Sequence, residues 1–183
     1  NPVGRAWTKA ELAEIGDICL ENDIIILSDE IHSDLVFKPH TFMPLAAVSP
    51  ELAMRSMSFI SPSKSFNIAG LSTAVAISAN EEFRQAYEKK MDDMHLFTGN
   101  LFGNIALEAA YRHGAEWLDM LNEYLYENAL FMEEFISNNI PQIEFTKPEA
   151  TYLGWLDFRK AGFNDKALRE RLINVAGLGL NDG

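Results

Sequence analysis

Four consecutive apolar residues, Ile24 to Leu27, determine which sheet architectures the chain can adopt, because three of them are β-branched and the run has no polar face. A half-exposed hairpin strand alternates apolar and polar residues, whereas a strand in a parallel sheet covered by helices is apolar on both faces. The run therefore predicts a buried strand in a parallel sheet with helices on either side.

The segments around this run supply the other elements of such a sheet. Thr8 and Glu11 form a capping box, which predicts that a helix begins there. Short apolar segments at 57–60 and 73–77 predict two more strands. Helical patterns then follow at about 80–94, through 106–111 and from 117 to about 137, with a break at His113-Gly114.

The chain after Pro141 has a different organisation from the chain before it. Segments 143–145 and 151–158 predict two strands, and 165–175 predicts a helix, which together indicate a separate α+β unit. We predict three parts: a sheet-centred domain at 1–115, a connecting helix at 116–140 and a small domain at 141–183. The chain opens on Asn1-Pro2 without an initiator Met, so we expect it to be part of a longer protein.

Charge and cysteine content restrict the partners and the compartment. Fifteen Lys and Arg against 27 Asp and Glu give a net charge of −12, which disfavours nucleic acid and anionic membrane surfaces as partners. No apolar run approaches the roughly 20 residues that span a bilayer. The single cysteine, Cys19, cannot form an internal disulfide and suits a reducing compartment, so we expect a cytoplasmic protein. The histidines lack metal-ligand spacing, and we predict no metal site.

Two polar groups follow predicted strands, where ligands bind in open parallel sheets. Asp29 comes after the run Ile24 to Leu27, and Ser61-Pro62-Ser63-Lys64 comes after segment 57–60. Apolar and small neighbours would disfavour the charged form of Lys64, and a neutral amine can attack carbonyl carbon. Taken alone, such a lysine is more often an ordinary loop residue whose charge stays in water.

An acid, a lysine, an asparagine and hydroxyls are what a pyridine cofactor with an aldehyde group requires. Asp29 and Lys64 are 35 residues apart, which leaves room for one further strand and its connections. Both side chains can therefore reach one crevice from neighbouring strand ends.

Three ordered motifs carry a family resemblance: Asn1-Pro2-x-Gly4, the segment SDEIHSDLVF at 28–37 and the segment SPSKSFNIAGL at 61–71. Together they resemble the fold-type I, pyridoxal phosphate (PLP)-dependent enzymes of aminotransferase class I and II, and most of all their MalY/PatB branch of cystathionine β-lyases (C–S lyases). The resemblance covers the whole chain. It implies an α/β fold, with part of a three-layer large domain and an α+β part of the small domain.

The resemblance also implies six residues that contact PLP: Asn1, Asp29, His32, Ser61, Ser63 and Lys64. Lys64 would bind the cofactor aldehyde covalently and act as the catalytic base at the substrate Cα. Asp29 would pair with the protonated pyridine nitrogen, which helps the ring to accept electrons.

The remaining four residues would surround other parts of the cofactor. By the resemblance, Asn1 and His32 approach the phenolic oxygen, and Ser61 and Ser63 face the phosphate. One position departs from the family pattern: many members carry Arg eight residues after the lysine, whereas this chain has Ser72. The phosphate charge must then be balanced elsewhere, and the departure favours the lyase branch.

The resemblance leaves three functional readings open. The first is a lyase that releases thiol, pyruvate and ammonia from cystathionine or an S-substituted cysteine. The second is an amino-acid aminotransferase, since both reactions begin at the same carbon, and the third is an inactive fold fragment. For the complete protein, the family implies a homodimer with a small-molecule amino-acid substrate.

Overall fold

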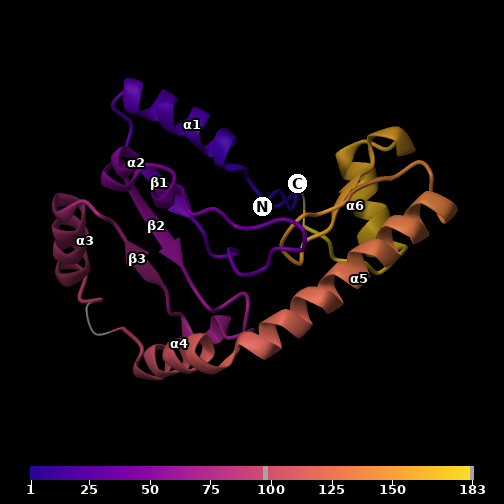
Figure 1. The fold of residues 1–183 in the computed structure, drawn as a ribbon. Coiled ribbons are helices and arrows are strands. Elements are labelled where there is room, and N and C mark those ends of the chain that lie inside the picture. The colour runs from indigo at the N-terminus through magenta and orange to yellow at the C-terminus, as the bar shows by residue number, and fades with distance from the viewer. Residues whose placement is uncertain (97–98, 182–183) are drawn as a thin grey trace. The chain divides into compact units, whose positions relative to one another are not determined.

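The computed structural model describes residues 1–96 and 99–181 (Figure 1). These residues form two compact units: the first is Ala6–Glu123, and the second combines Asn1–Arg5 with Tyr124–Gly183. The predicted limits of the three parts at 115 and 140 remain predictions, and residues 182–183 of the predicted small domain lie outside the described residues. No helix within 1–96 and 99–181 is both long enough and apolar enough to cross a membrane.

The first unit is built around a three-stranded sheet in the order β1 (Ile26–Asp29), β2 (Ser56–Ile60) and β3 (Val75–Ile77). β1 and β2 are parallel, which confirms the predicted pairing of the first strand. β3 is antiparallel to β2, so a fully parallel sheet was a wrong prediction. Parallel strands need a crossover, usually an α-helix, but the chain between β2 and β3 contains only the short helix η2 (Ala69–Leu71).

The helices of the first unit begin and end at recognisable sequence signals. They are α1 (Lys9–Glu21), η1 (Leu45–Ala47), α2 (Pro50–Arg55), α3 (Glu81–Asp93), α4 (Leu101–His113) and the first part of α5 (Ala115–Asn139). The capping box of α1 is confirmed: the Glu11 amide donates to Thr8 Oγ1 at 3.3 Å, and the Thr8 amide donates to Glu11 Oε2 at 2.9 Å. In Figure 1, α1 lies toward the β1 edge of the sheet and α4 toward the β3 edge.

Helix α2 was not predicted, although its start is visible in the sequence. Ser49 caps it by accepting a hydrogen bond from the Leu52 amide at 3.2 Å, and Pro50 occupies its first turn, where a missing amide proton costs nothing. Leu52 is buried against Gly16 of α1, where an added Cβ would lie 2.5 Å from the leucine side chain. A small residue in α1 thus lets the two helices pack closely.

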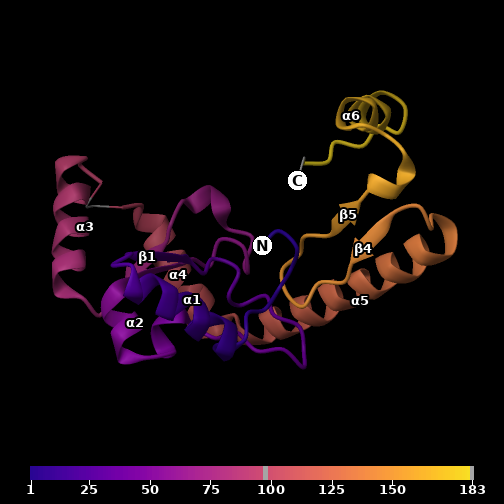
Figure 2. The same ribbon diagram turned by 90° about the horizontal axis from the view of Figure 1, so that it is seen from above.

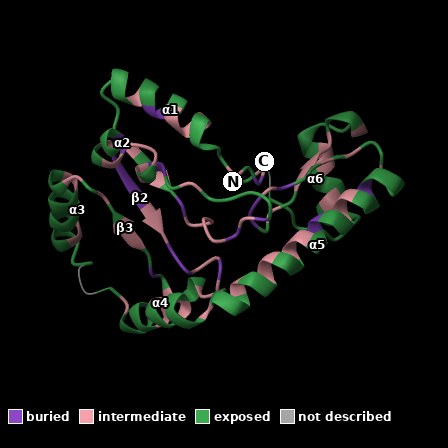
Figure 3. Ribbon diagram, in the orientation of Figure 1, coloured by how far each residue is buried: buried purple, intermediate pink, exposed green. Residues whose placement is uncertain are grey.

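Burial in the first unit differs from the prediction for the apolar run (Figure 3). The buried apolar side chains of this unit are Leu35, Phe37, Leu45, Leu52 and Met57. Ile24, Ile25 and Leu27 are instead 47%, 52% and 69% exposed, so their predicted burial is wrong. The strand also starts two residues later than predicted, because the Ile24 amide still bonds to Cys19 at the end of α1.

The second unit contains the remainder of α5, a two-stranded antiparallel sheet and a final helix (Figure 2). Its other elements are β4 (Glu144–Thr146), β5 (Trp155–Asp157), η3 (Arg159–Ala161) and α6 (Asp165–Asn174). The predicted strand at 151–158 is shorter than expected, because Thr151 has a left-handed φ of 68° and interrupts an extended backbone. Ala129, Ile136 and Ala150 are its buried apolar residues.

The N-terminal segment belongs to the second unit through Gly4. The Gly4 carbonyl accepts hydrogen bonds from the amides of Glu149 at 2.7 Å and Ala150 at 3.0 Å. Gly4 has φ +75°, and a Cβ at this position would lie 2.5 Å from Pro148 Cβ. Both observations require glycine here, which explains the glycine of the Asn-Pro-x-Gly motif in physical terms.

Candidate functional site

A pocket of about 290 Å³ opens in the first unit, where β2 ends and β3 begins. This volume is close to the lower end of the range of about 300–1,000 Å³ that is usual for small-molecule sites. Its lining residues are Ile31, Ser61, Ser63, Lys64, Ser72, Thr73 and Ala74. Three of the six residues predicted to contact a cofactor therefore lie together in one cavity.

The two serines of the pocket join its walls. Ser61 is buried, and its hydroxyl lies 2.7 Å from the Thr73 carbonyl and 2.7 Å from Ser63 Oγ. The Ser63 amide also donates to Ser61 Oγ at 3.1 Å. Since a hydroxyl donates one hydrogen, a Ser61 that donates to Thr73 must accept from Ser63, so the Ser63 hydroxyl donates to an anionic ligand only when it leaves Ser61.

The wall formed by Ser72 and Thr73 is held by α4. The Asn100 side-chain amide donates to the Leu71 carbonyl at 2.7 Å, and a Cβ on Gly103 would lie 2.7 Å from the same oxygen. Ser72 has a left-handed φ of 46°. The missing side chain of Gly103 therefore lets the first turns of α4 lie directly against this wall.

The charges of Lys64 and Asp29 both act on His32. Burial lowers the pKa of His32 below its usual 6.5, and the positive charge of Lys64 lowers it further, whereas the negative charge of Asp29 raises it. His32 therefore favours its neutral form, in which it can accept or donate a hydrogen bond. His32 thus lies within electrostatic range of one residue at the β1 end and one after the β2 end, and their joint contact with a cofactor stays a prediction.

Asp29 is the last residue of β1 and is exposed. It is paired in register with Phe59 of β2, which places it beside the chain that leads to Lys64. Its Oδ1 accepts a hydrogen bond from the Ile31 amide at 3.2 Å. The carboxylate is thus oriented by the backbone that follows the strand while it stays accessible to a ligand.

Asn1 belongs to the second unit, whereas the other five predicted contact residues belong to the first. Its predicted contact with a cofactor stays a prediction.

Glu30 is a buried acidic residue to which the sequence analysis assigned no role. It is only 8% exposed, and its Oε1 accepts hydrogen bonds from Ser28 Oγ at 2.9 Å, Ser58 Oγ at 3.0 Å and the Leu45 amide at 3.2 Å. These bonds connect β1, β2 and η1 through Glu30, the residue that follows Asp29 in the chain. The available signal was a second acid beside Asp29 at a strand end, but its partners are distant in sequence.

Ser65, the residue after Lys64, was also missed. It is fully buried, and its hydroxyl donates to Asp34 Oδ2 at 2.8 Å. The residue before the lysine thus faces the pocket, and the residue after it is held in the interior.

The side chains of this site fit a phosphorylated pyridine aldehyde. Lys64 supplies an amine for the aldehyde, Asp29 a carboxylate for a protonated ring nitrogen, and Ser63 a hydroxyl for a phosphate. Within the described ranges, no group of three or more His, Cys, Asp or Glu side chains could hold a metal ion.

Comparisons with known proteins identify the family of the chain. The sequence model of the family described as "Aminotransferase class I and II" matches residues 1–180. Cystathionine beta-lyase PatB of Bacillus subtilis is 38% identical over 183 residues, which cover all of this chain and 47% of PatB. The chain thus spans about half the length of the curated relatives that it matches.

Two solved structures contain the same arrangement of elements. Cystalysin from Treponema denticola, which contains a pyridoxal 5'-phosphate cofactor, has a TM-score of 0.96 and 34% identity over all of this chain and 46% of its own. The PLP-bound C-S lyase from Staphylococcus hominis has a TM-score of 0.86 and 34% identity over 97% of this chain and 45% of its own.

The predicted α/β fold and the predicted resemblance are both confirmed by these comparisons. The match extends from the Asn-Pro-x-Gly motif through the lysine segment to the second unit. The chain belongs to the aminotransferase class I and II family.

Proposed function

We propose that the complete protein is a PLP-dependent C–S β-lyase that cleaves cystathionine or a related S-substituted cysteine. The observation that carries the proposal is the pocket in which Lys64 lies with Ser61 and Ser63, in a chain that aligns throughout with a cystathionine beta-lyase at 38% identity. The products would be a thiol and aminoacrylate, and one water would hydrolyse the aminoacrylate to pyruvate and ammonia.

Lys64 and Asp29 would carry the chemistry. When bound, PLP supplies an aldehyde that takes up the substrate amine and a ring that accepts electrons from Cα. The Lys64 amine, which faces the pocket, would remove the proton from the substrate Cα. The electron pair left at Cα would then form a double bond to Cβ as the bond between Cβ and sulfur breaks, and the sulfur would leave as a thiolate that takes up a proton to give the thiol. Asp29 would keep the ring nitrogen protonated through a charge-assisted hydrogen bond.

The other predicted residues would orient the cofactor. Ser61 and Ser63 would donate to the phosphate oxygens in place of the bonds that they make to Thr73 and to each other. Neutral His32 and Asn1 would approach the phenolic oxygen, and the low pKa of His32 supports a hydrogen bond without an added positive charge.

An amino-acid aminotransferase is the second candidate, and the family description favours it. Both reactions begin with loss of the substrate Cα proton to Lys64. They differ in whether a bond at Cβ then breaks, so the products distinguish them. The proposed small-molecule substrate is an amino acid in either case.

We also propose that the complete protein is a cytoplasmic homodimer, as the family resemblance implies. Light scattering of the complete protein tests the dimer: a mass of one subunit contradicts it. The third reading, an inactive fragment, applies to the 183 residues alone, and it predicts that this chain gives no visible absorbance with PLP.

The experiment is to add PLP to the complete protein and record its visible spectrum, then to assay cystathionine for pyruvate and thiol. Lys64→Ala should abolish both the band and the products, because the amine provides the covalent link and the base. Lys38→Ala, which alters an exposed lysine of the same unit, should change neither. Amino transfer to a keto acid without thiol release would contradict the lyase and support the aminotransferase.

A further inference from the structure

The backbone that carries Lys64 is held from behind by four polar residues: Asp34, Ser65, Tyr111 and Asn122. We refer to them as the Asp34 cluster. Its shortest bond to the lysine segment joins Ser65 Oγ to Asp34 Oδ2 at 2.8 Å, and Ser65 is fully buried. Asp34 does not line the pocket. Its hydrogen bond to the lysine segment is the one to Ser65, the residue next to Lys64.

Two helices hold Asp34 in turn. Burial raises the pKa of the Tyr111 hydroxyl of α4 to about 12, and the nearby side chain of Asp34 adds to this rise. The Asn122 side-chain amide of α5 donates to the Asp34 carbonyl at 3.0 Å. Within the described residues, Asn122 Oδ1 is buried without a hydrogen-bond partner, which is costly. The Asn122 side chain is therefore bonded at only one end of its amide, the end that donates to Asp34.

Close packing supports the same connection. The Phe66 ring lies edge-on to the Tyr111 ring, with centroids 6.1 Å apart, and a Cβ on Gly114 would lie 2.3 Å from Phe66. The Trp117 indole also donates to the Ser65 carbonyl at 3.4 Å. The two residues after Lys64 are therefore fixed against the junction of α4 and α5 by side-chain, backbone and ring contacts.

The turn around Lys64 is closed by two backbone hydrogen bonds. The Phe66 amide donates to the Pro62 carbonyl at 2.9 Å, and the Ile68 amide donates to the Ser63 carbonyl at 3.1 Å. These two bonds lie within the turn, so they do not attach it to the rest of the unit. The Asp34 cluster supplies a fixed attachment to the interior at the residue next to the lysine.

We propose that Asp34 is a positioning residue for Lys64. Tyr111 and Asn122 hold Asp34, and Asp34 accepts the hydrogen bond of the Ser65 hydroxyl, so that the lysine amine keeps its place in the pocket. The role of Lys64 itself rests on the proposed function. The geometry of the segment does not depend on that function, and it can be tested without the cofactor.

The test compares Ser65→Ala with Ser58→Ala in the complete protein. Both serines are buried and both donate to a carboxylate, Ser65 to Asp34 at 2.8 Å and Ser58 to Glu30 at 3.0 Å. The two variants thus lose the same kind of bond, but only Ser65 adjoins the lysine. Amide hydrogen exchange of the cofactor-free protein is measured at Phe66 and Ile68.

We expect both amides to exchange about 10- to 100-fold faster in Ser65→Ala than in Ser58→Ala, which is the effect of losing a hydrogen bond to a charged group. With PLP added, we expect the pH midpoint of the Lys64-dependent visible band to shift in Ser65→Ala and not in Ser58→Ala. A general loss of stability would not change the exchange at Phe66 and Ile68, or the pH midpoint of the band, in one variant more than in the other.

Equal exchange at Phe66 and Ile68 in the two variants, with equal midpoints of the band, would overturn the proposal. If Ser65→Ala does not fold, Tyr111→Phe decides by the same criteria, because it keeps the ring contact with Phe66 and removes the hydroxyl. If the unaltered protein gives no visible band, the proposed function fails, and the exchange comparison alone then decides whether the cluster holds the lysine segment.

Discussion

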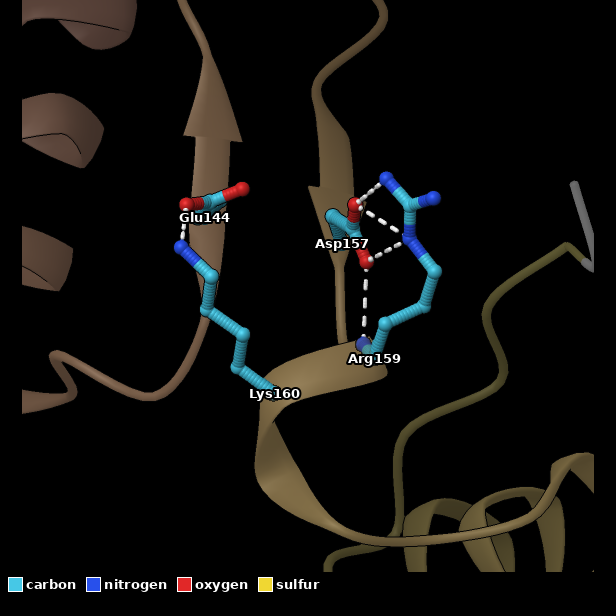
Figure 4. Close-up of polar contacts among 4 residues, drawn as sticks. All are labelled: Glu144, Asp157, Arg159 and Lys160. Carbon is cyan, nitrogen blue, oxygen red and sulfur yellow. Dashed lines mark hydrogen bonds and ion pairs between the residues drawn. The ribbon is translucent and has the colours of Figure 1, made fainter.

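The lysine segment of the first unit and the β4–β5 hairpin of the second both depend on polar contacts, but these contacts differ in burial. Ser61 and Ser65 bond in the interior at 6% and 0% exposure. In the hairpin, Arg159 pairs with Asp157 and Lys160 pairs with Glu144 (Figure 4). The Arg159 and Lys160 side chains are 89% and 68% exposed. A buried bond fixes an atom because breaking it leaves a group unsatisfied, whereas water replaces the partner of an exposed ion pair.

Glu30→Ala should give the largest effect on stability. It removes the acceptor of three hydrogen bonds behind Asp29, so buried donors would lose their partner, at a cost on the order of 3 kcal/mol. Urea unfolding measures the change. Glu21→Ala, at an exposed position at the end of α1, is the matched control. A loss below about 1 kcal/mol, the usual net value of a single hydrogen bond, would break the distinction between buried and exposed polar contacts.

Gly4→Ala should have the next largest effect, and it sharpens the comparison inside the second unit. Gly4 and Gly162 both have left-handed φ angles, +75° and +76°, but a Cβ meets Pro148 at 2.5 Å only at Gly4, and nothing lies within 4 Å at Gly162. Gly162→Ala should therefore cost about 1 kcal/mol for the backbone alone. Gly4→Ala should lower the free energy of unfolding by more, because its Cβ also collides with Pro148. If denaturant unfolding gave the same loss of stability for both variants, the contact with Pro148 would contribute nothing to the effect of Gly4→Ala.

Arg159→Ala should have the smallest effect at neutral pH, because the Arg159 side chain is 89% exposed to water, although its partner Asp157 is only 16% exposed. Hydrogen bonds from Arg159 lower the pKa of Asp157 from 3.8 to about 2. A lowered carboxyl pKa stabilises the folded state above about pH 3.8 and loses that contribution as the pH falls toward 2. The difference between wild type and Arg159→Ala should therefore vanish at the acidic end of a pH series of unfolding measurements. A difference that grows toward low pH would contradict this assignment.

Local signals in the sequence predicted those parts of the fold that depend on neighbouring residues. The Thr8 capping box predicted α1, and the strand ends predicted the positions of Asp29 and Lys64. A capping bond spans three residues and depends on little else, so tertiary structure does not alter it.

Features that depend on distant partners could not be predicted in this way. The direction of β3 follows from how segment 61–74 turns back, which no periodicity encodes. Asp34 and Asn122 are 88 residues apart, and Ser65 and Asp34 are 31 apart. A serine beside a lysine therefore gives no sign of whether its hydroxyl faces a ligand or the interior.

Helix α4 holds the two walls of the pocket in different ways, and this difference predicts which substitutions each wall tolerates. At its start, Asn100 and Gly103 lie against the carbonyl of Leu71, a group that every amino acid possesses. At its end, Tyr111 interacts with the side chain of Asp34. We therefore expect the Leu71 side chain to be replaceable without loss of this contact to α4, whereas a change of the Asp34 side chain also removes the interactions of its partners.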